Sequence, residues 1–182
     1  MRIITGKFKG RRLLTVPDDS VRPATDRVKG SIFNMLQNRL NLVDAAVLDL
    51  FAGSGSLGFE ALSRGAASVV FVDDSSIALE FVDRNAGVLG CADACETIQG
   101  DALDFIAKAR SKFDLIFADP PYEYPGTSRL PEAILARELL MKEGFLIIEH
   151  ARRTSFEPSA FYALAERREF GNTHVSFFTH PA

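Results

Sequence analysis

The sequence predicts an α/β fold, in which a mostly parallel sheet is covered by helices on both faces and ends in an antiparallel hairpin. From residue 46 onwards, short apolar runs alternate with amphipathic stretches. Strands this apolar are typical of a parallel sheet that is buried on both sides. The helical patterns stop after Pro158, and two adjacent strand patterns then meet at a turn formed by Gly171 and Asn172.

The first 40 residues differ in charge from the rest of the chain. They contain nine Lys or Arg and three acids, a net charge of +6, whereas the remaining 142 residues contain 12 basic and 21 acidic groups, a net charge of −9. A basic segment on an acidic body suits a polyanionic partner, although charge alone is explained more simply by a solvated face. We expect a basic extension over residues 1–40, docked on a main domain over residues 41–182.

This extension is predicted to be a short hairpin followed by a helix. Strand patterns at 2–5 and 11–16 are joined through Gly6 and Gly10, which tolerate turn conformations. Apolar residues recur at helical spacing between residues 28 and 40, which predicts a helix.

The polar residues near the start of this helix have two predicted roles. Thr25 can cap the helix N-terminus, with Asp26 in the first turn. Arg27 and Lys29 fall off the main apolar stripe, so they are expected to face solvent.

The main domain contains five apolar runs and four amphipathic stretches before the closing hairpin. The apolar runs predict strands at 47–50, 69–72, 97–99, 115–118 and 145–148. The amphipathic stretches predict helices at 57–64, 76–89, 103–110 and 131–141, and the hairpin strands are expected at 161–167 and 173–179.

The composition excludes several classes of protein. The chain has 182 residues, 47% hydrophobic and 25% charged, which is ordinary for a compact globular protein and unlike disordered or collagen-like sequences. No apolar run approaches the roughly 20 residues needed to cross a bilayer, and the first residues lack the apolar block of a signal peptide. We therefore expect a cytoplasmic protein without membrane contact.

The residues that commonly bind metals are too scattered to predict a metal site. Cys91 and Cys95 are four positions apart with no histidine close by, which predicts ordinary reduced thiols. His150, His174 and His180 have no ligand-like spacing. We expect neither a disulfide framework nor a bound metal.

A glycine motif follows the first strand of the predicted sheet. Gly53, Gly55 and Gly58 form G-x-G-x-x-G between a strand and a helix, and Asp73 follows 20 residues after the first glycine, at the end of the next strand. Glycines there let the backbone approach a ligand, and the carboxylate can accept hydrogen bonds from ribose hydroxyls. The motif predicts an adenosine ligand, and taken alone it fits a nicotinamide dinucleotide equally well.

Asp49 favours a different adenosine ligand. It ends the strand that precedes the glycines, at the crevice where such sheets bind ligands. A carboxylate there would repel a dinucleotide pyrophosphate and attract a ligand that carries an ammonium and a sulfonium group. S-adenosylmethionine carries both. The alternative, Asp49 as a helix N-cap, is weaker because the helix is expected to start several residues later.

Asp101 follows the third strand, at the same predicted edge of the sheet as Asp49 and Asp73. Its carboxylate can accept a hydrogen bond from an adenine amino group, or it can cap the next helix. Both interpretations stay open at this point. Three acids at three successive strand ends predict one pocket for an adenosine that carries a methionine group.

The sequence Asp119-Pro120-Pro121-Tyr122, directly after the fourth strand, is the most specific signal in the chain. Two consecutive prolines hold the backbone in a rigid extended turn and keep carbonyl oxygens available as acceptors. An exocyclic amine is a poor nucleophile because its lone pair is delocalised into the base. Hydrogen bonds from the amine to Asp119 and the Pro120 carbonyl would localise that lone pair, and Tyr122 could stack on the base.

These motifs resemble the bacterial RsmD family, which methylates a guanine N2 in small-subunit ribosomal RNA. The resemblance spans nearly the whole chain and is carried by Asp49-x-Phe-Ala-Gly-Ser-Gly-x-x-Gly, Asp119-Pro-Pro-Tyr, Arg2-Ile-Ile-x-Gly-Lys-Phe-Lys-Gly-Arg, Arg22-Pro-x-Thr-Asp-Arg-Val and Glu169-Phe-Gly-Asn-Thr-His-Val-Ser-Phe. It implies a class I methyltransferase fold, Rossmann-like with a seven-stranded sheet, in which residues 41–182 form the catalytic domain.

The resemblance also implies a donor, a substrate and site residues. The donor is S-adenosylmethionine, the product S-adenosylhomocysteine, and the substrate ribosomal RNA on an assembling small subunit. We expect the catalytic residues to be Asp119, Pro120 and Tyr122. We expect the cofactor-binding residues to be Asp49, Phe51, Gly53, Gly55, Asp73, Asp101 and Ala102. We expect the RNA-binding residues to be Arg2, Lys7, Lys9, Arg11, Arg12, Arg22 and Arg27. We expect the arm that carries them to lie beside the Asp119-Pro-Pro-Tyr loop and to bind RNA phosphates.

Several points depart from the family pattern or stay open. Asp73 stands where the family often has Glu, and Ser75 where Asp often follows, so the ribose contact is expected to be shorter or water-mediated. Arg22 could contact the cofactor carboxylate instead of RNA. A monomer is expected. The alternative functions are an amino methyltransferase acting on adenine N6 or cytosine N4 of DNA, a dinucleotide-dependent oxidoreductase, and a noncatalytic RNA-binding module.

Overall fold

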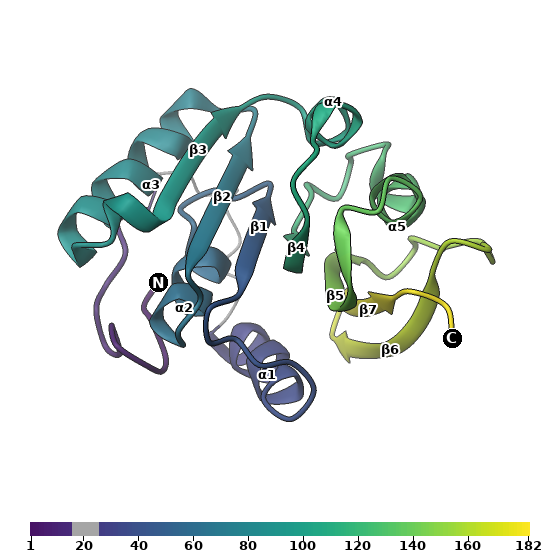
Figure 1. Cartoon of the computed structure of the whole chain (residues 1–182), viewed down its shortest axis with the longest axis horizontal. Coiled ribbons are helices and arrows are strands. Elements are labelled where there is room, and N and C mark those ends of the chain that lie inside the picture. The colour runs from purple at the N-terminus through teal and green to yellow at the C-terminus, as the bar shows by residue number, and fades with distance from the viewer. Residues whose placement is uncertain (16–25) are drawn as a thin grey trace.

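The computed structural model describes residues 1–15 and 26–182, and in these residues seven strands form one sheet in the order β3-β2-β1-β4-β5-β7-β6 (Figure 1). The strands are β1 (Ala46–Leu50), β2 (Ser68–Asp73), β3 (Cys95–Gln99), β4 (Phe113–Ala118), β5 (Leu140–Ala151), β6 (Ala163–Phe170) and β7 (Thr173–Thr179). The first five pair in parallel, and β7 is antiparallel to both β5 and β6. The predicted parallel sheet and closing hairpin are confirmed.

Helices cover both faces of this sheet. They are α1 (Asp26–Leu36), α2 (Ser56–Ser63), α3 (Ser76–Leu89), α4 (Ala102–Lys108) and α5 (Leu130–Leu135), with 3₁₀ turns η1 (Ala92–Ala94) and η2 (Thr127–Arg129). Alternate strand residues face opposite sides: Val47 packs with α1, α2 and α3, whereas Leu48 packs with α4 and α5. Burial on both faces explains why the strands read as continuous apolar runs.

The helix predicted at 131–141 is wrong in its second half. α5 ends at Leu135, and Leu140 already belongs to β5, where it pairs with Phe113. Glu138, between the two, has a φ of 55°, which a helix cannot continue through. The apolar residues at 139–141 therefore serve the sheet rather than a helix face. α4 also ends earlier than predicted, at Lys108, because Ala109 is extended.

The strands predicted at 2–5 and 11–16 are not formed within the described residues. The two segments run antiparallel, but they meet in a single bridge between Arg2 and Arg12. Two of the backbone donors that could extend the bridge bind α2 instead: the N–H groups of Ile4 and Thr5 donate to the Glu60 carboxylate at 2.8 and 3.1 Å. The segment is thus bound to α2 instead of forming a ladder.

The turn of this N-terminal segment lies directly against the C-terminal end of α2. The N–H of Phe8 donates to the Ser63 hydroxyl at 2.8 Å, and the N–H of Lys7 donates to the Ser63 carbonyl at 2.7 Å. Gly6 has a φ of 88°, and a Cβ at this position would lie 1.8 Å from the Ser63 carbonyl oxygen. Ile3, Phe8 and the α1 residues join the same hydrophobic core as β1. The boundary predicted at residue 40 stays a prediction.

Lys29 corrects a second expectation about this segment. It is fully buried instead of facing solvent, and its ammonium donates to the Arg2 carbonyl at 2.6 Å and to the Ser56 hydroxyl at 2.9 Å. The Glu60 carboxylate lies 3.7 Å away and supplies the countercharge. Burial lowers the pKa of Lys29. Residue 25, the predicted cap of α1, lies outside the described residues. No helix in the described ranges has the length and apolar character needed to span a bilayer.

Candidate active site

The carboxyl ends of the parallel strands hold two adjoining cavities, of about 430 and 150 Å³. Both are lined by Phe51, Asp119 and Pro121, so the two cavities adjoin at these residues, and together they are called the cleft. The larger cavity is also lined by Met1, Asp49, Ala52, Gly53, Ser54, Ser56, Leu57, Pro120, Tyr122 and Glu149. The smaller is also lined by Val72, Asp73, Asp74, Gly100, Asp101, Ala102 and Tyr124. The cleft thus brings together the predicted acids from four different strand ends.

Asp49 lies at the base of the larger cavity with 2% of its surface exposed. Its carboxylate accepts a hydrogen bond from the N–H of Gly58 in the first turn of α2, at 2.9 Å. The contact with the helix that we considered weaker is therefore present, although the helix begins only at Ser56. Burial raises the pKa of Asp49 to about 8, because the charged form loses its hydration.

The three glycines of the motif serve different purposes. Gly53 lines the larger cavity, and a Cβ there would meet no other atom, so the backbone is open to a ligand. Gly55, with a φ of 80°, would place a Cβ 2.6 Å from the Phe59 ring, and Gly58 would place one 2.3 Å from Phe71. The last two glycines therefore allow α2 to pack closely on the sheet. Among the described residues Gly55 lies outside both cavity linings, and its cofactor contact stays a prediction.

Asp73 joins the glycine turn to the end of β2. Its carboxylate accepts hydrogen bonds from the N–H groups of Gly53 at 2.8 Å and Ser75 at 2.9 Å, and burial raises its pKa. Ser75 has a separate structural role: its hydroxyl caps α3 by accepting from the N–H of Ala78 at 3.2 Å. Asp73 holds the turn in shape while lining the smaller cavity.

Asp101 is the N-cap of α4, as one of its two interpretations predicted. One carboxylate oxygen accepts from the N–H groups of Leu103 and Asp104, and the other accepts from the Tyr124 hydroxyl at 2.9 Å. Tyr124 was not predicted as a site residue. Its ring meets Phe51 edge to face at 4.8 Å, and burial raises its pKa to about 12. Together these residues form a wall of the smaller cavity.

The loop after β4 closes the larger cavity. Asp119, Pro120 and Tyr122 all line it, so the predicted catalytic residues are side by side. The Tyr122 hydroxyl makes a hydrogen bond with that of Thr173 in β7, which fixes the ring against the hairpin. This contact joins residues 51 positions apart and was not predicted. The stacking role of Tyr122 stays a prediction.

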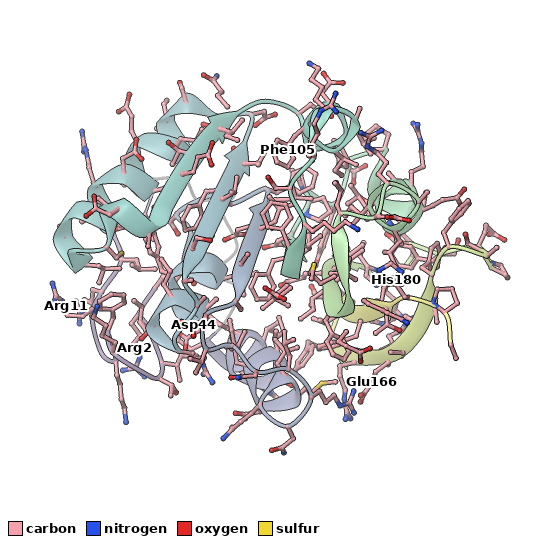
Figure 2. The ribbon with its side chains drawn as sticks, viewed as in Figure 1. Arg2, Arg11, Asp44, Phe105, Glu166 and His180 are labelled. Atoms are coloured by element: carbon pink, nitrogen blue, oxygen red, sulfur yellow. The ribbon has the colours of Figure 1, made fainter. Side chains whose placement is uncertain are left out.

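The predicted RNA-binding residues are spread along the molecule instead of gathering beside Asp119. Arg2 pairs with Asp26 at 3.2 Å, near Met1 at the cavity. The Arg11 guanidinium donates to the Val88 carbonyl near the far end of α3 (Figure 2). At 1.5 Å per residue, Val88 lies about 18 Å along α3 from its first residue. Lys7 and Lys9 lie in the turn beside Ser63, about 10 Å along α2 from the cavity.

All the described members of this RNA-binding set are exposed: Arg2, Lys7, Lys9, Arg11, Arg12 and Arg27. Arg22 lies outside the described residues. The expectation that the whole arm lies next to the Asp119 loop is therefore wrong for its turn, because the N–H groups of the turn bind the far end of α2.

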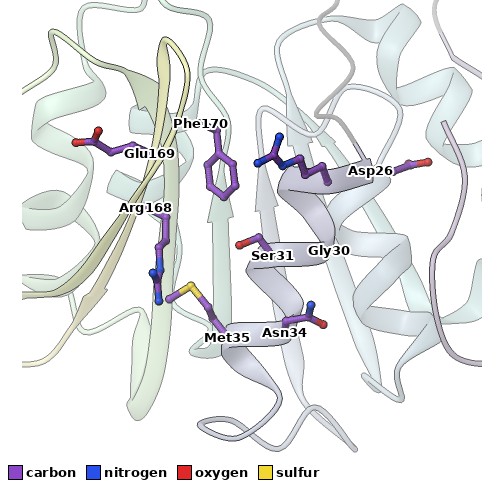
Figure 3. Close-up of a pocket in the computed structure, with 9 residues that line it drawn as sticks. Asp26, Gly30, Ser31, Asn34, Met35, Arg168, Glu169 and Phe170 are labelled. Atoms are coloured by element: carbon purple, nitrogen blue, oxygen red, sulfur yellow. The ribbon is translucent and has the colours of Figure 1, made fainter.

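Arg27 lines a separate groove of about 550 Å³ between α1 and β6. Figure 3 shows Arg168 and Phe170 on the hairpin facing Ser31 and Met35 on the helix. The groove adjoins the cleft, because Phe170 pairs with Thr173, whose hydroxyl contacts Tyr122. This surface was not found from sequence, since its two sides lie more than 130 residues apart.

Comparison with known proteins supports the methyltransferase interpretation. The sequence profile of the family described as Conserved hypothetical protein 95 matches residues 1–179. YlbH of Bacillus subtilis, provisionally named an rRNA methyltransferase, is 38% identical over 98% of both chains. Ribosomal RNA small subunit methyltransferase D of Haemophilus influenzae is 39% identical over 68% of this chain and 65% of its own length.

The fold agrees with these relatives. The structure of the methyltransferase homologue YhhF from Escherichia coli superposes with a TM-score of 0.87 at 28% identity, covering 100% of this chain and 98% of that one. The sheet order and its solved neighbours identify a class I methyltransferase fold. The chain therefore belongs to the Conserved hypothetical protein 95 family, the family of RsmD that its sequence motifs indicated.

Proposed function

We propose that the protein transfers a methyl group from S-adenosylmethionine to the N2 amino group of a guanine in small-subunit ribosomal RNA. The observation that carries this proposal is the pair of adjoining cavities in which Asp49, Asp73 and Asp101 surround the Asp119-Pro-Pro-Tyr loop. The relatives named as rRNA methyltransferases support an RNA substrate. Transfer on an assembling small subunit is part of the same proposal.

The residues of the cleft fit S-adenosylmethionine, which supplies an activated methyl group when bound. Asp73 and Asp101 offer acceptors for ribose hydroxyls and an adenine amine, between apolar walls made by Phe51 and Val72. Asp49 offers a buried carboxylate for a cationic methionine end. The open backbone at Gly53 leaves room between these ends.

The chain's own residues would prepare the amine for transfer. Asp119 and the Pro120 carbonyl accept hydrogen bonds from its two protons and so aim its lone pair at the methyl group. Tyr122, held by Thr173, provides a rigid aromatic face for an unstacked base. The reaction also releases a proton, for which the Asp119 carboxylate is the nearest proposed acceptor.

Two other functions fit less of the site. A DNA adenine or cytosine methyltransferase would use the same loop, but the relatives carry rRNA names. A dinucleotide oxidoreductase would place a pyrophosphate near the buried Asp49 and would leave the Asp119 loop without a role.

The test is transfer of a tritiated methyl group to unmethylated small-subunit particles, free small-subunit rRNA and duplex DNA, followed by nucleoside analysis. We expect N2-methylguanosine from one of the RNA substrates. Labelled N6-methyladenine or N4-methylcytosine from DNA would reject the proposal, as would unlabelled RNA in all preparations.

Cofactor binding should depend on pH through Asp49. Burial raises the pKa of Asp49 to about 8, so at lower pH the carboxyl must first lose its proton before it can pair with the ligand ammonium. S-adenosylhomocysteine should therefore bind more tightly as the pH rises through 8. The Asp49→Asn variant should bind roughly ten- to a hundredfold more weakly above this pH and lose that dependence. Calorimetry across the range measures both effects, with the exposed Asp93→Asn as a control. Identical pH profiles for wild type and Asp49→Asn would contradict the assignment.

The part of the basic arm that lies far from the cleft, which carries Lys7, Lys9 and Arg11, should contribute to RNA affinity without changing the affinity for the cofactor. Replacing Lys7, Lys9 and Arg11 by alanine should lower the salt slope of RNA binding by up to roughly 0.7–0.9 for each phosphate that these side chains neutralise. Filter binding at several salt concentrations measures this slope. The control removes the same charge from exposed residues elsewhere, Lys108, Arg110 and Lys142. Equal slopes in the two triple variants would show that the arm is an ordinary solvated face.

A further inference from the structure

Glu149 is a further carboxylate of the cleft, and it has no part in the proposed methyl transfer. It lies near the carboxyl end of β5, is 8% exposed, and lines the larger cavity together with Asp119, Pro120 and Tyr122. Its neighbour His150 belongs to the other face of the sheet, where the ring packs edge to face on Phe156 at 4.9 Å. Glu149 is therefore on the cavity face, as strand alternation requires.

The sheet register places Glu149 beside Asp119. Ala118 of β4 pairs with Ile148 of β5, so the next residue on each strand is Asp119 and Glu149. Neighbouring strands lie about 4.8 Å apart, so the two side chains are close enough to contact the same base. Two carboxylates thus border the place proposed for the target base.

Tyr122 limits where that base can lie. Its hydroxyl contacts Thr173, and Thr173 pairs with Ala151, two residues beyond Glu149 and on the same face of the sheet. The ring therefore passes from the loop after β4 across the end of β5, alongside Glu149. A base stacked on this ring would present its edge to both carboxylates.

The bases differ in what lies next to their exocyclic amine. In guanine, the N2 amine adjoins N1–H, which is a second donor. In adenine and cytosine, the amine adjoins a ring nitrogen with a lone pair, which a carboxylate would repel. Enzymes read an unstacked base through the hydrogen bonds of its Watson–Crick edge, and a site built to pair with a donor rejects bases that lack it.

We propose that Glu149 accepts the N1–H of the target guanine and so makes the site select guanine over adenine and cytosine. This inference rests on the proposed function, since it concerns the same base and the same cleft. Asp119 then serves the reacting amine, and Glu149 serves base identity.

The test exchanges the donor on N1 while keeping the reacting amine. Small-subunit rRNA is ligated with either guanosine or 2,6-diaminopurine riboside at the methylated position, which is first located by mass spectrometry of nuclease fragments of the methylated RNA, and is assembled into particles. Diaminopurine keeps the amine at C2 but has a lone pair on N1. Wild type should favour guanine by about a hundredfold or more in kcat/KM. Glu149→Gln should narrow this preference at least tenfold, because its amide can also donate to N1.

Two further variants separate selection from folding. Glu149→Asp keeps the carboxylate and should retain the preference for guanine at a reduced rate, so it tests the proposal even if Glu149→Gln folds poorly. Glu143→Gln, an exposed change on the same strand, should behave as wild type. S-adenosylhomocysteine affinity and thermal melting report on folding.

The outcomes distinguish this inference from the function on which it rests. If wild type methylates guanine but Glu149→Gln lowers kcat/KM by the same factor for the guanine and the diaminopurine particles, the preference is unchanged and the inference is overturned. If wild type methylates guanine and diaminopurine with equal kcat/KM, the inference is overturned as well. If wild type methylates neither particle, the proposed function itself fails.

Discussion

Replacing Asp119 by alanine should lower the rate of methyl transfer by a factor of about 100 to 1,000, which is roughly 3–4 kcal/mol of transition-state stabilisation. Asp119 follows β4 and lines both cavities. Its proposed hydrogen bond to the amine strengthens as positive charge develops on the nitrogen. The substitution should therefore affect the rate far more than the affinity for the cofactor.

Single-turnover transfer to small-subunit particles measures this rate without a contribution from product release. Calorimetry with S-adenosylhomocysteine provides the comparison, and we expect its affinity to change by less than about tenfold. Asp74→Asn is the matched control, because Asp74 lines only the smaller cavity. That variant should alter affinity without lowering the single-turnover rate at saturating cofactor. A near-normal rate in Asp119→Ala would remove Asp119 from the proposed mechanism.

The acids of the cleft were predictable because each lies at or just after the end of a predicted strand. Asp49, Asp73, Asp101 and Asp119 stand at successive strand ends, and parallel strands place their carboxyl ends at one edge. The sequence signal is local in each case. The hairpin at the end of the chain was predictable for the same reason, since its turn and both strands are contiguous.

The missed residues depend on contacts between distant segments. Tyr124 reaches Asp101 across 23 positions, and the hydroxyls of Tyr122 and Thr173 meet across 51. Glu149 carries no local motif, because its position in the cleft comes from the pairing of β5 with β4. The nearest sequence signal was an acid at the end of an apolar run, which is the pattern that identified Asp119.

The predictions for the N-terminal segment were wrong for a related reason. Its two strand patterns do run antiparallel, but the N–H groups of Ile4, Thr5 and Phe8 bind Glu60 and Ser63 of α2. α2 is buried along its whole length, and a buried carboxylate such as that of Glu60 requires a cation beside it. The charge of Glu60 was therefore the available signal that a cation is buried nearby. Lys29 is that cation, and helical periodicity alone placed it on the wrong face.

Removing the charge of Glu60 should destabilise the protein by about 3–5 kcal/mol, because Glu60→Gln leaves the Lys29 ammonium buried with neutral partners. Lys29→Met should lower the free energy of unfolding by a smaller amount. In that variant the Glu60 carboxylate keeps Arg64 at 3.0 Å and the N–H groups of Ile4 and Thr5. Urea unfolding followed by circular dichroism measures both variants.

The double variant and the pH dependence identify the cause. If the unpaired ammonium is responsible, Lys29→Met with Glu60→Gln should be more stable than Glu60→Gln alone. The pKa of Lys29 is below 10.5 in the folded protein, so the unfolded chain binds more protons there. The stability of Glu60→Gln should therefore rise with pH until the unfolded lysine also deprotonates. Because the Lys29 ammonium binds Ser56, which lines the larger cavity, the same variant should also weaken S-adenosylhomocysteine binding. If the double variant does not reduce the destabilisation of Glu60→Gln, and this destabilisation is independent of pH, Glu60 acts through Arg64 and the N–H groups of Ile4 and Thr5 instead of through Lys29.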